Sequence, residues 1–190
     1  IGRAMSRESI PTPVWARLDK HYIWMILLTT LGFAAIGFVD DYLKLVKGRS
    51  LGLKARWKMA AQIVVGLALG LSLVYFTNGQ FETRVSLPFF KKVLIDMGKF
   101  YIPFVILVVV GTSNAVNLTD GLDGLAIGPT LIAAGFYTIV AYLAGNVNFS
   151  RYLQIVYVEG AGELTVFCAA MMGAGMGFLW YNTYPASVFM

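Results

Sequence analysis

Residues 101–125 read YIPFVILVVVGTSNAVNLTDGLDGL, and they decide the fold because an apolar run of membrane length ends in a cluster of polar groups. Two amides and two carboxylates stand close together in this cluster, and a second apolar run follows. A charge costs about 2.5–3.5 kcal/mol at the centre of a bilayer. Polar side chains here are therefore expected to face a partner, a cavity or a ligand.

The composition of the whole chain agrees with a membrane protein. Hydrophobic residues make up 58% and charged residues 13% of the sequence, whereas soluble domains average about 45–50% apolar and about 25% charged residues. The single cysteine, Cys168, excludes an internal disulfide framework and is expected to pack within an apolar run. We expect one membrane domain over residues 1–190.

Five apolar runs approach the roughly 20 residues that a helix needs to cross a bilayer. They are too long for strands and lack period-2 alternation, so the pattern predicts helices. The fold class is therefore an all-α, polytopic integral membrane bundle. The expected spans are residues 22–39, 59–76, 101–116, 125–143 and 164–181.

Two of these runs contain Gly-x-x-x-Gly, at Gly66/Gly70 and at Gly173/Gly177. Small residues at this spacing allow two helix backbones to approach closely. We expect both pairs to serve in helix packing rather than in a ligand site.

The net charge of +5 comes from basic residues beside membrane segments, without a separate polar domain. Lipid head groups or phosphates therefore explain these residues better than nucleic acid does. Basic residues that follow the first apolar run and would suit phosphates are Lys44, Lys47, Arg49, Lys54 and Arg56.

The first apolar run ends at Val39, and Asp40 and Asp41 follow it directly. If the helix continues, Lys44 is i+4 from Asp40 and i+3 from Asp41 and lies near both. An ordinary juxtamembrane charge cluster is the alternative interpretation. However, two acids at a helix C-terminus oppose the helix dipole, so a compensating charge is expected, and a divalent cation would supply it.

The second cluster spaces its polar residues by three, at Asn114, Asn117, Asp120 and Asp123. The two Asp-Gly pairs are turn signals, so we expect one helix to end near Asn117 and the next to begin after Asp123. The alternative roles are an N-cap for Asp123 and a helix-terminus amide for Asn117.

Together the two clusters supply four carboxylates, which we expect on one face of the membrane. Mg²⁺ typically takes one or two carboxylates, while phosphate oxygens and water complete its shell. A pyrophosphate-bearing substrate that meets a lipid phosphate at the interface is consistent with this set. His21, the only histidine, is expected on the opposite face and is not a candidate ligand.

From about Tyr22 to Met190 the sequence resembles the polyprenyl-phosphate sugar-1-phosphate transferases. Two motifs carry the resemblance: Asp40-Asp41-Tyr-Leu-Lys44 and Asn114-Ala-Val-Asn117-Leu-Thr-Asp120-Gly-Leu-Asp123-Gly. Within that family the sequence looks most like the branch of peptidoglycan synthesis. The resemblance implies transfer of phospho-MurNAc-pentapeptide from UDP-MurNAc-pentapeptide to undecaprenyl phosphate, giving lipid I and UMP, with Mg²⁺ as cofactor.

The resemblance also implies roles for individual residues. Asp40, Asp41 and Lys44 would be catalytic, with Asp41 organising metal or pyrophosphate and Asp40 engaging the lipid phosphate as base or orienting group; a covalent aspartyl intermediate stays open. The substrate-binding residues would be Asn114, Asn117, Asp120, Asp123, Asn182 and Phe189.

Members of the family continue beyond the position of Met190 with a further metal-binding Asp and a histidine-rich loop, and they carry helices before that of Tyr22. We therefore expect this chain to be a central portion that is inactive alone. A homodimer stays an open alternative.

The resemblance places the protein in the bacterial cytoplasmic membrane, with both clusters facing the cytoplasm, although the summed Lys and Arg count of the connections favours the opposite orientation. Two alternatives remain for the function. One is a sister transferase that uses UDP-N-acetylglucosamine, and the other is a transporter with an acidic ion path.

Overall fold

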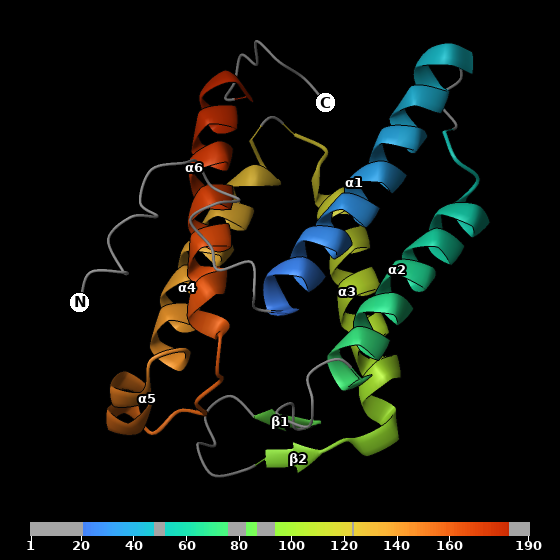
Figure 1. Cartoon of the computed structure of the whole chain (residues 1–190). Helices are drawn as coiled ribbons and strands as arrows, with labels where there is room; N and C mark the ends of the chain where they lie inside the picture. Colours follow the sequence, from blue (N-terminus) through green and yellow to red (C-terminus); the bar gives the residue numbers. More distant parts are fainter. Residues whose placement is uncertain (1–20, 48–51, 76–82, 87–93, 123, 183–190) are drawn as a thin grey trace, which may run out of the picture. The chain divides into compact units, whose positions relative to one another are not determined.

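The computed structural model describes residues 21–47, 52–75, 83–86, 94–122 and 124–182. Within these ranges the chain is mostly helical, as the apolar runs predict (Figure 1). The α-helices are α1 (His21–Lys47), α2 (Ala55–Tyr75), α3 (Tyr101–Thr119), α4 (Ile127–Ala144), α5 (Val147–Leu153) and α6 (Leu164–Asn182).

All of these helices except α5 are long and apolar enough to cross a membrane. Large apolar side chains cover their outer surfaces, for example Phe38 at 71%, Leu107 at 71% and Ile132 at 76% exposure. Such extensive apolar exposure is unusual for a soluble protein, and lipid is the solvent that would cover it. The protein is thus a multi-pass helical membrane protein.

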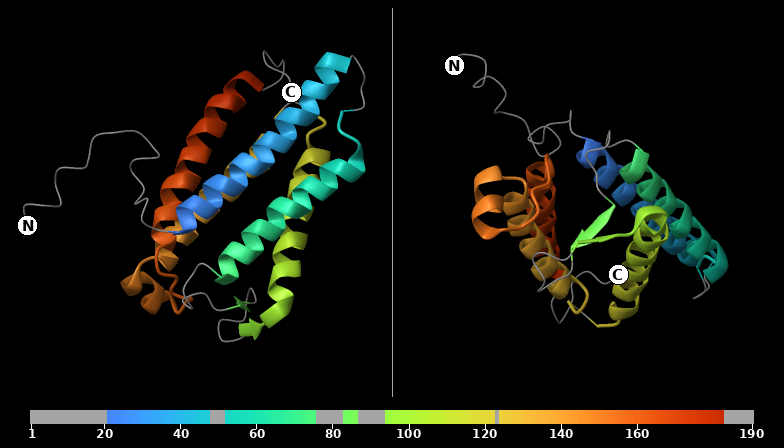
Figure 2. Two further views of the ribbon diagram at one scale, coloured as in Figure 1. Left: turned by 45° about the vertical axis from the view of Figure 1, so that its right-hand side comes forward. Right: turned by 90° about the horizontal axis from the view of Figure 1, so that it is seen from below.

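The described residues fall into two compact units, one of which comprises Trp24–Ala115. In it, α1 and α2 run antiparallel, because Asp40 pairs with Lys58 near one end and Gly32 lies against Val65 further along. Helix α2 runs antiparallel to α3, since Gly66 lies against Ile106 and Gly70 against Ile102. The views in Figure 2 show these three helices side by side.

A small β-hairpin connects α2 to α3, although no strand was expected in this connection. The strands β1 (Arg84–Ser86) and β2 (Leu94–Asp96) pair antiparallel, with Val85 opposite Ile95. The Asp96 carboxylate accepts hydrogen bonds from the Thr83 hydroxyl and the Gly98 N–H, which hold its pKa below the ordinary value. A short 3₁₀ helix, η1 (Gly98–Phe100), then leads into α3.

The other compact unit contains α4, α5 and α6. Helices α4 and α6 run antiparallel, because Gly135 lies against Met172 and Gly175 against Leu131. Helix α5, which was not expected, begins at an Asn146 N-cap whose side chain accepts the N–H groups of Asn148 and Phe149. A second 3₁₀ helix, η2 (Ala161–Glu163), precedes α6.

The two Gly-x-x-x-Gly pairs differ in outcome. The packing prediction is confirmed for Gly66 and Gly70, which are both buried against α3. Gly173 and Gly177 meet nothing within 4 Å in the described part of the chain, so for this pair the packing role stays a prediction. Successive helix residues are about 100° apart, so Gly175 lies on nearly the opposite face of α6, and that is the face that contacts α4.

Candidate active site

The Asp40-Asp41 pair lies inside helix α1, not at its end. The helix continues past the expected limit at Val39 to Lys47, because no residue after Val39 breaks the helical pattern. The predicted spacing is confirmed, and the Lys44 ammonium lies 3.2 Å from Asp40 Oδ2 and 2.8 Å from Asp41 Oδ1.

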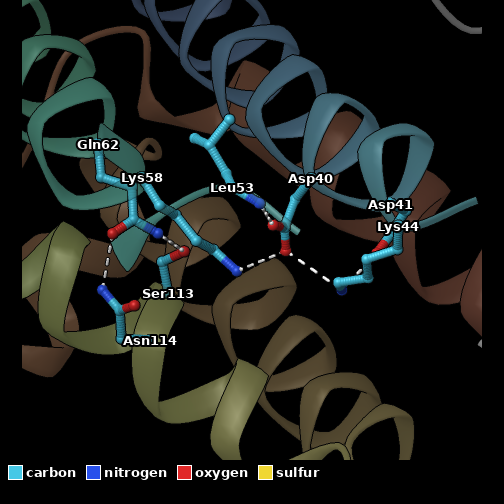
Figure 3. A network of polar contacts seen from close by, with 8 residues as sticks. All are labelled: Asp40, Asp41, Lys44, Leu53, Lys58, Gln62, Ser113 and Asn114. Atoms are coloured by element: carbon cyan, nitrogen blue, oxygen red, sulfur yellow. Dashed lines mark hydrogen bonds and ion pairs between the residues drawn. The ribbon is translucent and has the colours of Figure 1, made fainter. Parts of the chain in front are cut away.

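Asp40 is the centre of the site, with a carboxylate that is only 9% exposed. Its Oδ1 accepts the backbone N–H of Leu53 at 2.7 Å, and its Oδ2 accepts the ammonium of Lys58 at 3.1 Å (Figure 3). A carboxylate this buried needs charged or hydrogen-bonded partners to offset its lost hydration. Lys44, Lys58 and the Leu53 N–H supply them, so no metal ion is needed for this purpose.

Gly52 makes the Leu53 contact possible. A Cβ at position 52 would clash with Asp40 Oδ1 and would lie 2.7 Å from the Asp40 carbonyl oxygen and 2.9 Å from Lys44 Cε. The chain passes so close to α1 here that only glycine leaves room for the carboxylate. The connection between α1 and α2 is thereby held against Asp40.

Asp41 differs from its neighbour because its side chain is 66% exposed. Its Oδ1 accepts a hydrogen bond from Lys44, whose own side chain is 42% exposed. An accessible carboxylate thus stands beside an accessible ammonium, and this ammonium also contacts the buried Asp40. This arrangement can present one negative and one positive group to a ligand.

Asn114 is not at the exposed tip of its cluster but between two helices. Its Nδ2 donates to Gln62 Oε1 on α2 and to Val110 O on α3, both at 2.8 Å. Gln62 is only 3% exposed, and its Nε2 donates to Ser113 Oγ at 3.4 Å. Gln62 lies one turn after Lys58 on α2, which connects this contact to the carboxylate site (Figure 3).

The remaining predicted site residues lie in other parts of the chain. Asn117, in the last turn of α3, and Asp120 just after it are both exposed. Asn182 is the last residue of α6. Helix α4 has Ala126 as its N-cap, so the alternative capping role for Asp123 is wrong for this helix. Asp123 itself, Phe189 and the side chain of Asn182 lie outside the described residues.

Sequence reasoning missed Lys58, Gly52 and Gln62. Lys58 and Gln62 are separated by four residues at the start of an apolar run, and this spacing on one helix face was a usable signal. Gly52 carries no such signal, because only the folded connection shows how closely it approaches Asp40.

A metal site of several ligands is not formed by the residues described, among which no three His, Cys, Asp or Glu gather. The exposed Asp41 carboxylate nevertheless has the chemistry that Mg²⁺ prefers. One or two carboxylates are sufficient when phosphate and water complete the shell. The donor set is consistent with Mg²⁺ brought together with a phosphate ligand.

The fold and the site define a class: a multi-pass helical membrane protein with a partly buried carboxylate–ammonium cluster. Residues 23–190 match the family model described as glycosyl transferase family 4. The chain therefore belongs to glycosyl transferase family 4.

Two curated relatives are each 55% identical to the chain over 181 residues, one from Geobacter sp. (strain M21) and one from Citrifermentans bemidjiense. Both carry the name phospho-N-acetylmuramoyl-pentapeptide-transferase. The match covers 95% of this chain and 50% of each relative, so the chain spans about half the length of these proteins. Neither relative carries the name of the sister N-acetylglucosamine transferase.

Proposed function

We propose that the full-length protein transfers phospho-MurNAc-pentapeptide from its UDP carrier to undecaprenyl phosphate, giving lipid I and UMP. The names of the two relatives support the substrate pair. The structural observation that supports the transfer reaction is the exposed Asp41–Lys44 ion pair, in which Lys44 also contacts the buried Asp40. A site with both signs of charge suits the joining of two phosphate-bearing substrates, because phosphoryl transfer depends mainly on positioning and charge neutralisation.

The two acids have different roles in this proposal. Asp40 is an orienting group, since both of its oxygens already accept hydrogen bonds from Leu53 and Lys58. It holds the two ammonium groups in place. Asp41 and Lys44 are the groups that meet the substrates, and the lipid phosphate is the nucleophile. A strong base is unnecessary because a phosphate monoester, with its second pKa near about 6, is largely dianionic at neutral pH.

Asp41 is the residue that would hold Mg²⁺, because its carboxylate is accessible and Lys44 engages only one of its two oxygens in the contacts found. When bound, the ion would neutralise pyrophosphate charge. Replacing Asp41 with Asn keeps the shape and removes the charge. The variant should need more Mg²⁺ for half-maximal activity, and an unchanged requirement would exclude Asp41 as a metal ligand.

The decisive assay is UMP release by the purified full-length protein in the presence of undecaprenyl phosphate and Mg²⁺. We expect release from UDP-MurNAc-pentapeptide and none from UDP-N-acetylglucosamine. Release from the second substrate alone would identify the sister activity, and release from neither would refute the proposed function. The 190-residue chain assayed by itself checks the expectation that this portion is inactive.

We place the site on the cytoplasmic side of the bacterial inner membrane, where a nucleotide-activated substrate is available. Cysteines introduced singly as Arg49→Cys, Arg84→Cys and Arg151→Cys test this orientation with an impermeant thiol reagent in intact cells, in a Cys168→Ser background. Positions 84 and 151 should be labelled and position 49 protected. The reverse pattern would invert the topology and support the summed charge count.

A further inference from the structure

Gln62 is the most buried polar side chain in helix α2, at 3% exposure. Every residue around it in the sequence from Met59 to Leu71 is otherwise apolar or glycine. A buried amide within a membrane span is costly unless its donor and acceptor are both used. Its Oε1 accepts the Asn114 side chain and its Nε2 donates to Ser113, so both are used across the interface with α3.

The position of Gln62 gives this contact a consequence for the site. Lys58 lies four residues earlier on α2 and so shares a helix face with Gln62. The Lys58 ammonium holds Asp40 Oδ2 at 3.1 Å. A rotation or slide of α2 against α3 would therefore move Lys58 relative to Asp40. Gly66 and Gly70 keep the same two helices in close contact further along but cannot set a rotation through hydrogen bonds.

We propose that Gln62 is a positioning residue, and that Asn114 acts through it rather than on the substrate. Gln62 and Asn114 form an amide clamp that fixes the rotation of α2 on α3, and this rotation places Lys58 against Asp40. The clamp connects the Asp40-Asp41 motif to helix α3 at Asn114. The expected changes in kcat and KM rest on the proposed function. The clamp itself can also be tested by the thermal stability of the protein.

Exchange of the two clamp residues tests this inference in the full-length protein. Gln62→Asn shortens the side chain on α2 by a methylene, and Asn114→Gln lengthens the side chain on α3 by one. Each single variant therefore misplaces the hydrogen bond between the two amides. The double variant restores the summed length. Ser72→Ala is the control on α2, because the Ser72 hydroxyl donates only to Leu69 of its own helix in the contacts found.

We expect each single variant to lower kcat about tenfold, or ~1.4 kcal/mol at 25 °C, with KM for both substrates within about twofold of the wild-type value. The double variant should recover kcat to within about threefold, and Ser72→Ala should change neither constant. A raised KM in Asn114→Gln without recovery in the double variant would show that Asn114 binds substrate. Unchanged kcat in both single variants would show that the clamp is only structural. Either result overturns the proposal.

Thermal unfolding of the same proteins in detergent separates the clamp from the proposed function. If the wild-type protein releases no UMP, the function has failed, but the clamp still predicts that the double variant regains the melting temperature lost by the singles. Purely additive losses would refute the clamp whatever the activity.

Discussion

Helices α1–α3 and helices α4 and α6 are held together by different means. Between the first three, buried polar side chains cross from helix to helix, at Asp40–Lys58 and Gln62–Asn114. Between α4 and α6, glycines meet apolar side chains, as Gly175 meets Leu131, while the hydroxyls of Thr130 and Thr138 donate to carbonyls of their own helix.

The comparison shows where chemistry can be placed in a membrane bundle. Lipid removes most of the hydrophobic gain from helix association, so close packing and interhelical hydrogen bonds take over. In the contacts found among the described residues, α4 and α6 meet where glycines lie against apolar side chains. Polar contacts join α1–α3 and simultaneously hold a carboxylate and two ammonium groups in fixed positions.

The largest expected effect comes from Asp40→Asn. The amide keeps the volume but carries no charge, so the ion pairs of Asp40 with Lys44 and Lys58 are lost. Activity of the full-length protein should fall by about 10²–10³-fold, the range for removal of a preorganised electrostatic group. The loss is measured as the rate of UMP release by the variant and by the wild-type protein at saturating substrate concentrations.

Thr138→Ala is the matched change in the α4–α6 pair, where the hydroxyl bonds only to its own helix in the contacts found. It should alter activity less than about twofold. If Thr138→Ala lost as much activity as Asp40→Asn, the proposal that only α1–α3 hold the catalytic groups would be wrong.

A smaller effect is expected from Gly52→Ala. The added methyl would displace the Asp40 carboxylate or push the Leu53 N–H away from it. We expect activity to fall by about tenfold or more, since small displacements of catalytic groups are costly. Gly37→Ala on α1 provides the control, because a Cβ there meets nothing within 4 Å in the described chain. Equal activity of the two variants would mean that the connection does not position Asp40.

The smallest effect concerns the glycines of α6. Gly175→Leu should overpack against Leu131 and Ile127, at a cost of about 1–3 kcal/mol. Its melting temperature in detergent should drop by several degrees, whereas Gly173→Leu should leave it near the wild-type value. A similar drop for Gly173→Leu would reveal that further parts of the full-length protein cover that face.

Much of the site was predictable from sequence because it depends on local spacing. Asp40, Asp41 and Lys44 lie within one helix turn or so of each other, and their contacts follow once the segment is helical. The assignment of Asn114 to substrate binding had no such support, because its neighbours depend on which helix packs against α3. That helix supplies Gln62, more than fifty residues away in the chain.

The sequence by itself determined the class of fold, the five membrane-length helices and the spacing of the acid pair, because each depends on hydropathy or on the period of one helix. Tertiary structure alone decided which helix faces meet. It buried Asp40 but left Asp41 exposed, and among the described residues it placed Gly66 and Gly70, but not Gly173 and Gly177, against another helix. The physical reason is that apolar side chains surround every span, so hydropathy does not distinguish the face toward lipid from the face toward another helix.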